Sequence, residues 1–291
     1  MIVKASATNV LSNESLATGK FLSLIAMEYK YFIGIDISKY TLDWCLFKGS
    51  EFVLHMKIEN SASSIKSCLT LLKKEYKAIG KYTIFCFEYL EPYQNILITE
   101  LIRKKLAVWA ESPLHIKRSL GIQRGKSDKL DSIRIARFAY LNRAKPHLWQ
   151  QPRDVVVKLK FLSLYRKKIH KVIRGLQNDL GEKSIFLKKD PLLMASQLTN
   201  VSIAGLKGDY KKATMLMFDI IEKDEFLKHM VHILTSVPGV GNVIAIEMII
   251  VTNEFKNFQS AKKFASYCGI APFENTSGIS LRGKTKTSRL A

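Results

Sequence analysis

The sequence predicts an α/β domain followed by long helices and a small α-helical C-terminal domain. Strand-like and helix-like runs alternate over the first half of the chain. A long stripe of apolar residues at helical spacing follows, and a Pro-Gly-Val-Gly turn separates two later helices. The chain has 291 residues, which favours about two domains with a connecting element, and 47% of its residues are hydrophobic, enough for packed cores.

The first half is expected to form three strands and then alternating helices and strands. Residues 31–37 and 41–47 are rich in apolar and β-branched side chains, and apolar residues alternate with polar ones from 52 to 58. A helix capped by Ser63 or Ser64 and closed by Gly80 comes next. The remaining elements are a strand at 82–87, a helix after Pro92, a strand at 106–110 and a helix from Pro113, giving the order β-β-β-α-β-α-β-α.

A long helix is predicted from Pro152 to Leu180. Its apolar residues follow alternating spacings of four and three, and only Arg166 interrupts their stripe. Such a stripe has to be buried, so the helix needs a partner, either residues 215–230 of the same chain or a second copy. Residues 181–208 are expected to form a looser connection. The stripe consists of Val155, Leu159, Leu162, Ile169, Ile173, Leu176 and Leu180.

The charge of the chain indicates a polyanionic partner. There are 46 Lys and Arg against 25 Asp and Glu, a net charge of +21. From Arg103 to Arg174 there are 20 basic and 4 acidic residues, a local excess of 16. Nucleic acid is the partner that this favours first, and an anionic membrane surface is second. No stretch approaches the ~20 apolar residues that cross a bilayer, so an integral membrane protein is excluded.

The cysteines indicate a reducing compartment. Cys45, Cys68, Cys86 and Cys268 show no CxxC spacing, and two of them lie within strand-like apolar runs. This usage is typical of reduced core residues, so we expect neither a disulfide framework nor a zinc site. A cytoplasmic protein is therefore expected.

Four carboxylates stand where a metal site could form. Asp36 ends the first predicted strand and Glu88 follows the fourth, where side chains project from the carboxyl edge of a sheet. Asp128 and Asp131 are three residues apart at the start of a helix and share one face. Together they would form an all-oxygen site for Mg²⁺, which assists phosphodiester displacement. Taken singly, Asp36 could start an Asx turn and the Asp pair could complement a helix dipole, and Glu91 is a rival of Glu88.

Basic residues surround the Asp pair. Arg124, Lys126 and Arg134 are candidates to hold phosphates next to the carboxylates. The alternative is a solvated helix face whose charges pair with one another.

The turn before the last apolar helix resembles a helix-hairpin-helix. Glycines at a helix start let backbone N–H groups approach a phosphate, so Pro238, Gly239 and Gly241 are candidate nucleic-acid contacts. The alternative is a tight packing turn.

A serine near the C-terminus lies in a predicted turn. Ser277 is followed by Arg282 and Lys284, and a hydroxyl beside cations attacks a phosphodiester when a base or metal reduces its proton affinity. From spacing alone, a surface turn is the simpler interpretation.

Taken together, these segments resemble the insertion-sequence-110 family of transposases. The matching segments are residues 31–39, 121–131, the Pro238-Gly-Val-Gly turn and residues 269–278, in the same order and with similar separations over residues 28–291. The resemblance implies a RuvC-like, ribonuclease-H-type N-terminal domain with a DEDD metal site, a coiled-coil linker and a C-terminal transposase domain with a nucleophilic serine. It also implies recombination guided by a structured bridge RNA that the element encodes. On this resemblance the metal-binding carboxylates are Asp36, Glu88, Asp128 and Asp131, and the nucleophile is Ser277.

The sequence departs from the family pattern at two places. After Glu88 the family has a Thr-Gly pair, whereas this chain has Leu90-Glu91, so the choice between Glu88 and Glu91 stays open. Family members continue beyond the Ser-Gly motif, whereas this sequence stops at Ala291, which indicates a truncated copy.

The predicted organisation has four parts. They are a disordered leader at 1–27 with Met27 as the natural start, a RuvC-like domain at 28–148, a coiled-coil linker at 149–230 and an incomplete transposase domain at 231–291. The leading hypothesis is a bacterial, nucleoid-associated DNA recombinase that uses Mg²⁺, binds DNA and a guide RNA, and acts as a dimer or tetramer. The alternatives are a metal-dependent nuclease or junction resolvase in which water attacks, and a nucleic-acid-binding fragment without catalysis.

Overall fold

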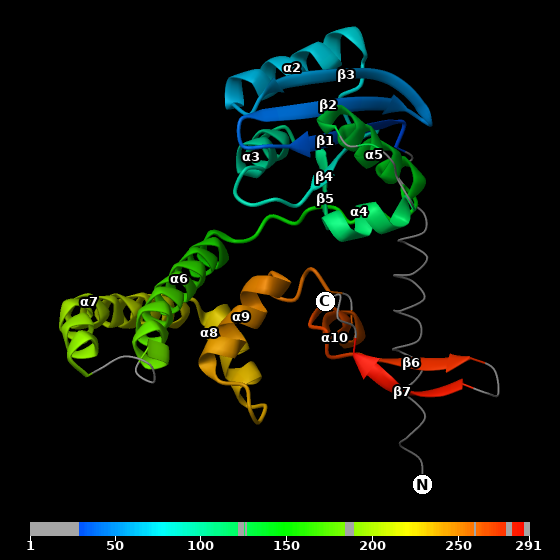
Figure 1. Cartoon of the computed structure of the whole chain (residues 1–291). Helices are drawn as coiled ribbons and strands as arrows, with labels where there is room; N and C mark the ends of the chain where they lie inside the picture. The colour runs from blue at the N-terminus through cyan, green and yellow to red at the C-terminus, as the bar shows by residue number, and fades with distance from the viewer. Residues whose placement is uncertain are drawn as a thin grey trace. The chain divides into compact units, whose positions relative to one another are not determined.

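The computed structural model describes residues 29–121, 125, 127–183, 189–258, 260–277 and 281–287. The chain divides into two compact units, Met1–Trp149 and Gln150–Ala291 (Figure 1). The expected leader, Arg124 and Lys126 lie outside the described residues.

The first unit is built on a mixed five-stranded sheet in the order β3-β2-β1-β4-β5. Its strand β2 is antiparallel to both β1 and β3, whereas β4 and β5 run parallel to β1. The predicted succession of strands and helices is confirmed. The strands are β1 (Tyr31–Ile37), β2 (Thr41–Lys48), β3 (Glu51–Glu59), β4 (Thr83–Glu88) and β5 (Ala107–Glu111).

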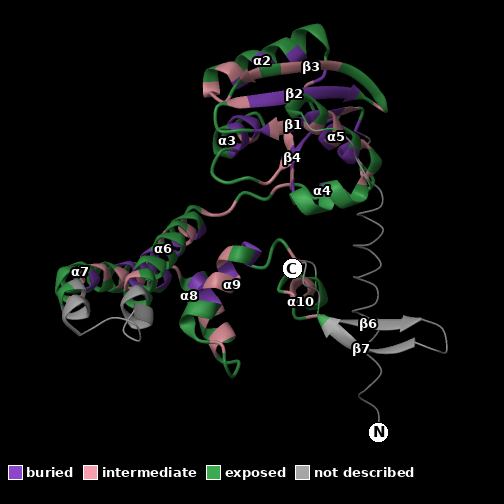
Figure 2. Cartoon of the chain, in the orientation of Figure 1, coloured by how far each residue is buried: buried purple, intermediate pink, exposed green. Residues whose placement is uncertain are grey.

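Helices cover both faces of this sheet, and the buried residues lie between the layers (Figure 2). Helices α2 (Ala62–Glu75) and α3 (Asn95–Arg103) bury one face, and α4 (Pro113–Ser119) and α5 (Asp128–Leu141) bury the other. The cap of α2 is Ser61, whose side chain accepts a hydrogen bond from the Ser64 backbone N–H at 3.3 Å, so the prediction of Ser63 or Ser64 was wrong. The helix also ends before Gly80.

A glycine in β1 allows α5 to lie directly against the strand. A Cβ atom on Gly34 would be 2.2 Å from the backbone nitrogen of Ala136 and 2.3 Å from the carbonyl oxygen of Ser132. Farther along the same pair of elements, the rings of Phe32 and Tyr140 meet edge-on with centroids 5.4 Å apart. Since α5 runs antiparallel to β1, its first turn lies at the strand end that carries Asp36.

The second unit is mainly helical. Helices α6 (Asp154–Lys183) and α7 (Lys189–Glu222) pack along each other, and the predicted apolar stripe of α6 faces α7 of the same chain. One cluster joins Leu159 to Met217 and Ile221, and a second joins Ile169 and Ile173 to Ile203. No helix in the described ranges is long and apolar enough to cross a membrane.

The prediction of a loose connection over residues 181–208 was wrong wherever the structure describes it, since residues 181–183 end α6. Residues 189–208 belong to α7. Two helical glycines, Gly205 and Gly208, weaken the helical pattern because each costs about 1 kcal/mol relative to alanine. Packing of Ile203 and Leu206 on α6 overrides this weak local preference.

An ion-pair network joins the ends of three helices in this unit. Helix α8 (Glu225–Thr235) begins after Asp224, and α9 (Asn242–Thr252) ends just before Glu254. Arg153 directly precedes α6, and its guanidinium donates hydrogen bonds to the carboxylates of Glu254 and Asp224. The bond to Asp224 is 2.8 Å long. Hydrogen bonding to Glu254 and to Asp224 raises the pKa of Arg153.

The prediction of a small α-helical C-terminal domain was incomplete, because it included no strands. After α10 (Ala261–Tyr267), strands β6 (Pro272–Ser277) and β7 (Leu281–Thr287) form an antiparallel pair. The Lys and Thr residues that alternate in β7 suit an exposed strand, but their charge hides the apolar signal by which strands are recognised. Ser277 is therefore the last residue of β6 rather than part of a turn.

Candidate metal and nucleic-acid site

The alternation of the strands places three carboxylates on the face that α5 covers. Phe32 and Gly34 face α5, so Asp36, two residues on, points to the same side. Asp43 on β2 is paired with Asp36 in the register, and Glu88 ends β4 on the same face as the buried Cys86. Asp36 and Glu88 therefore share a face at the ends of their strands, which explains why both project from one edge of the sheet.

The start of α5 supplies the other two predicted carboxylates. Ser127 caps the helix by accepting a hydrogen bond from the Leu130 backbone N–H at 3.2 Å. This fixes Asp128 and Asp131 in the first turn, where the helix dipole favours negative charge.

Mutual repulsion links the four predicted carboxylates. The pKa of Glu88 is raised by burial and by the negative charge of Asp131. The pKa of Asp36 is raised from 3.8 to about 6, first by burial and then by the charges of Asp131, Asp128, Glu88 and Asp43. Because each charge is felt at Asp36, the cluster favours an added cation.

Glu111 is a neighbouring carboxylate with a structural role, and its surroundings differ from those of Asp36 and Glu88. Glu111 on β5 pairs with Glu88 in the register. Burial by itself would raise the pKa of Glu111, but hydrogen bonds from His147, the Ser112 backbone N–H and Trp109 lower it to about 2. Glu111 is thus held ionised by donors of its own unit, whereas Asp36 and Glu88 have burial and like charges around them.

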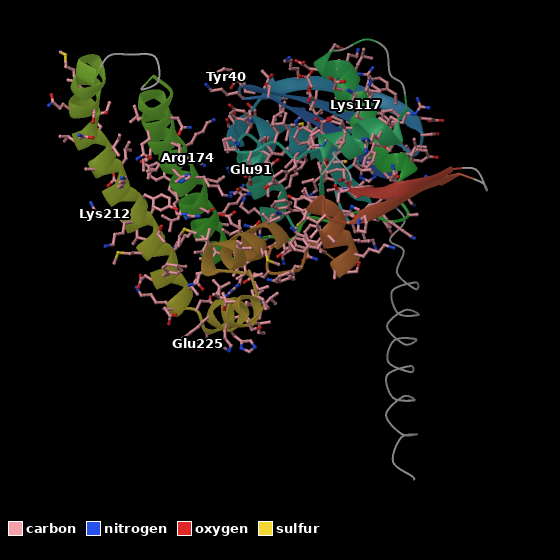
Figure 3. The ribbon with its side chains drawn as sticks, turned by 60° about the horizontal axis from the view of Figure 1, so that its bottom comes forward. Tyr40, Glu91, Lys117, Arg174, Lys212 and Glu225 are labelled. Carbon is pink, nitrogen blue, oxygen red and sulfur yellow. The ribbon has the colours of Figure 1, made fainter. Side chains whose placement is uncertain are left out.

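The rival residue Glu91 lies outside this cluster. Glu91, which is labelled in Figure 3, is exposed and accepts a hydrogen bond from the Tyr89 hydroxyl. The charge of Glu88, by contrast, contributes to the raised pKa of Asp36. This observation favours Glu88 as the fourth member of the carboxylate set.

Cations of the same unit hold part of the cluster. The Lys57 ammonium lies 3.2 Å from an Asp43 oxygen and 3.0 Å from an Asp128 oxygen. Arg134, a predicted phosphate contact, pairs with Asp131 at 2.7 Å and also donates to the Gly125 carbonyl. Among the residues described, no three acidic, imidazole or thiol side chains are arranged to hold one metal ion.

Sequence reasoning missed Lys57 and Asp43. The Asp43 side chain is 5% exposed, and its carboxylate accepts a hydrogen bond from His55 Nε2 at 2.8 Å. The signal was a charged residue inside the apolar strand 41–47, which is costly unless a partner neutralises it. Lys57 on the next strand is one such partner, and hydrogen bonds to Asp128 and Asp43 raise its pKa.

The other predicted nucleic-acid contacts lie in the second unit. Pro238 and Gly239 occupy the centre of a turn closed by the Val240 N–H and the Val237 carbonyl at 3.0 Å. Gly239 has φ +87°, a left-handed conformation that glycine adopts easily. Gly241 caps α9 with no side-chain hydrogen bond. For Ser277, Arg282 and Lys284 the structure describes the backbone in β6 and β7 but not the side chains.

Residues 33–182, just over half of the chain, match the transposase family DEDD_Tnp_IS110. The chain belongs to the IS110 family of transposases. Residues 231–291 match a second family description, Transposase IS116/IS110/IS902 family. These two matches fall on the segments that carry the resemblance in the sequence.

Two curated relatives are similar over most of the chain. They are the pilin gene-inverting proteins of Moraxella lacunata and Moraxella bovis, each 28% identical over 264 residues, which is 87% of this chain and 75% of the relative. The relatives are longer than the sequence described here.

Two solved structures of RuvC from Thermus thermophilus are similar to part of the chain. The one in complex with a Holliday junction has a TM-score of 0.31 and 12% identity, and covers 40% of this chain and 96% of RuvC. The other has a TM-score of 0.30 and 14% identity, and covers 39% and 95%. It is the unit's own strand order, with three antiparallel strands, two parallel ones and helices on both faces, that fits the RuvC-like fold implied by the family.

Proposed function

We propose that this member of the IS110 family cuts and rejoins DNA at a metal-dependent carboxylate site with a serine nucleophile. The observation that carries the proposal is the electrostatic coupling of Asp36 to Glu88, Asp128 and Asp131. A carboxylate whose pKa is raised by neighbouring carboxylates gains most from a multivalent cation.

The proposed cation is Mg²⁺, held by these four carboxylates. The donor set consists of oxygens only, which is the set that Mg²⁺ prefers. When bound, such an ion stabilises the developing charge of a phosphodiester displacement. Asp36 and Glu88 would orient it from the sheet, and Asp128 and Asp131 from α5, while Lys57 offsets part of the charge of Asp43 and Asp128 until the ion binds.

Ser277 is the proposed nucleophile. Its oxygen would form a bond to phosphorus as a bridging P–O bond of DNA breaks. The proton lost by the serine hydroxyl is balanced by the proton that the leaving sugar oxygen gains. The product is a phosphodiester that joins Ser277 to DNA. This ester conserves the energy of the broken bond, so reversal of the step rejoins DNA without another energy source.

The proposed partners are DNA and a structured guide RNA. The relatives are named for inverting a pilin gene, and inversion requires that both ends of a segment are cut and rejoined. The net charge of +21 supports binding of polyanions. The turn at Pro238 to Gly241 and the β6–β7 pair with Arg282 and Lys284 are the proposed contacts in the second unit, and Arg124, Lys126 and Arg134 in the first.

A homo-oligomer, with α6 forming part of a coiled coil, is also proposed. Leu159, Ile169 and Ile173 of the stripe are buried, but α6 has a second series of apolar side chains that stay exposed. Phe161 is 68% exposed and its ring stacks on Tyr165. Exposed apolar series of this kind support association with a second copy. The series consists of Val157, Phe161, Leu164, Tyr165 and Val172.

A DNA substrate with a fluorescent label tests the proposal. The full chain is incubated with DNA that carries the ends of the element, its structured RNA and Mg²⁺, and the products are separated on a denaturing protein gel. We expect a labelled covalent adduct that disappears in Ser277→Ala and persists in the matched control Ser280→Ala. Cut DNA without an adduct would favour the nuclease with attacking water, and neither product would favour a binding protein without catalysis.

Metal binding is tested separately from activity. Titration calorimetry with Mg²⁺ and with Mn²⁺ should give a binding signal for the parent that is lost in Asp36→Asn. Glu91→Gln should bind like the parent. A loss in Glu91→Gln but not in Glu88→Gln would move the fourth ligand to Glu91.

A further inference from the structure

A buried arginine in the second unit has no carboxylate partner in the described part of the chain. Arg166 is 6% exposed and lies on α6 between the apolar clusters of Leu159 and Ile169. Its Nη1 donates to the Tyr210 hydroxyl at 2.7 Å, and its guanidinium lies over that ring at 5.2 Å from the centroid. The Nε–H finds no acceptor among the residues that the structure describes. Burial of a charge without a counter-charge is strongly unfavourable, so the position calls for an anion from outside the chain.

Arg166 lines a cavity that is rich in other cations. The cavity has a volume of about 720 Å³. Lys167 has a partner, Glu247, at 2.6 Å, but Lys171 and Arg174 form no ion pair with any described residue. Figure 3 labels Arg174 on α6 and Lys212 on the neighbouring α7. The lining residues are Arg166, Lys167, His170, Lys171, Arg174, Gly175, Asn178, Tyr210 and Val243.

The start of α9 adds positive potential at the same cavity. Val243 belongs to the first turn of α9 and is part of the lining. The preceding cap residue, Gly241, offers no side-chain acceptor to the first N–H groups. Such groups carry the positive end of the helix dipole and bind anions readily. The anion preference of the cavity therefore has two independent sources, the side chains of α6 and the backbone of α9.

We propose that this cavity binds the phosphodiester backbone of a nucleic acid, with the Arg166 guanidinium as its buried anchor. The cations extend from Arg166 to Arg174, which is about 12 Å along α6 at 1.5 Å per residue. At about 3.4 Å per nucleotide of a duplex strand, this length matches three to four phosphates. A line of cations fits a chain of phosphates better than it fits a single small anion. DNA and RNA share this chemistry, and the proposal rests on the nucleic-acid partners proposed above.

The test measures binding in the absence of divalent cations, so that it does not depend on cleavage. Fluorescence anisotropy of the full chain is recorded with labelled DNA and RNA of the same sequence over a range of salt concentrations. Arg166→Met should weaken binding about tenfold and reduce the salt slope by about one, as for the loss of one phosphate contact. The control Lys158→Met removes the same charge from α6 outside the cavity and should change affinity by less than about twofold.

Thermal unfolding separates a binding role from a structural role. Methionine keeps most of the volume of arginine and removes the buried charge, so the melting temperature of Arg166→Met should stay equal or rise. Weakened binding of DNA, of RNA or of both supports the proposal and identifies the ligand. Unchanged binding of both, or an equal loss in Lys158→Met, overturns it. Inorganic phosphate that raises the melting temperature while Arg166→Met leaves oligonucleotide affinity unchanged overturns it as well.

A second variant keeps the test decisive if Arg166→Met does not fold. Arg174 is exposed and lines the same cavity, so Arg174→Met should fold and still lose about fivefold in affinity if phosphates lie there. Affinity equal to that of the parent in Arg174→Met would then overturn the proposal. Failure of the chain to cleave DNA bears on the carboxylate site and leaves this result unaffected.

Discussion

The two units of the chain hold opposite kinds of charge without a full complement of partners. In the first unit, Asp36 and Glu88 have raised pKa values, first because they are partly buried and then because neighbouring carboxylates repel their charges. In the second, Arg166 is buried among cations and apolar residues. The same physical cost thus points to different ligands, a metal cation for the α/β unit and a phosphate chain for the helical unit.

The largest effect is expected where the first unit packs most tightly. Gly34→Ala would place a Cβ 2.2 Å from the Ala136 backbone, and α5 would have to move away from β1. We expect a loss of about 3 kcal/mol in the free energy of unfolding, near the upper end of overpacking effects. Denaturant unfolding followed by tryptophan fluorescence checks this, since Trp44 and Trp109 are both buried in this unit. An unchanged midpoint would mean that α5 does not approach β1 so closely.

The second unit should be most sensitive at its ion-pair network. The Glu254 side chain is fully buried, and Arg153 connects it to Asp224. Removing one partner of a buried pair leaves the other charge uncompensated, so Arg153→Met should cost about 2 to 3 kcal/mol, less than the upper range because Lys256 remains. Thermal unfolding by circular dichroism at 222 nm, which reports mostly on helices, checks this. The exposed Arg118→Met serves as a control and should change little.

The carboxylate site should make stability depend on pH. Asp36 has a folded pKa of about 6, above its ordinary 3.8, so the folded state binds the proton more tightly and loses stability as the pH rises from about 4 to 6. Asp36→Asn should therefore be more stable than the parent at pH 8, by about 1 to 2 kcal/mol after allowance for solvent screening. This advantage should vanish near pH 4. Chemical unfolding in the presence of a chelator at both pH values checks it.

Glu111→Gln is the matched control, and its effect on stability should depend on pH in the opposite direction. Its folded pKa of about 2 lies below the ordinary 4.5, so its stabilisation is present above pH 4.5 and is lost as the pH falls toward 2. The variant should be less stable than the parent at pH 8 and similar to it at low pH. The same pH response in both variants would contradict the distinction between site and structural carboxylates.

Much of the first unit could be predicted because its local signals agree. Residues 31–37 are apolar and β-branched and form β1, and Asp128 and Asp131 were expected at the start of a helix, where α5 begins. The proximity of Asp36 to α5 was harder to predict from the sequence. It depends on the packing of Gly34 against Ala136, and these two residues are far apart in the sequence. Lys57 and Asp43 were missed for the same reason, because only the sheet register brings them to Asp128 and Asp36.

The second unit was harder to predict because long-range packing decides it. The interruption of the stripe by Arg166 was visible in the sequence, but whether Arg166 turned outward or inward depends on Tyr210, 44 residues later. The length of α7 was missed because Gly205 and Gly208 weaken its local pattern. In β7, pairing with β6 through the backbone outweighs the charged composition of the strand.

The smallest predicted effect is a gain in stability at these helical glycines. A Cβ added at Gly205 would meet nothing within 4 Å, and its backbone is already helical. Gly205→Ala should therefore stabilise the helical unit by about 0.5 to 1 kcal/mol, because alanine restricts the unfolded chain more than glycine does. Gly239→Ala, where φ is +87°, should instead destabilise it by about 1 kcal/mol, although that position is equally open. Thermal unfolding of both variants separates the two causes, since space is the same and only the backbone conformation differs. A gain at both positions would contradict the left-handed turn before α9, and a loss at Gly205 would contradict the continuity of α7 through that residue.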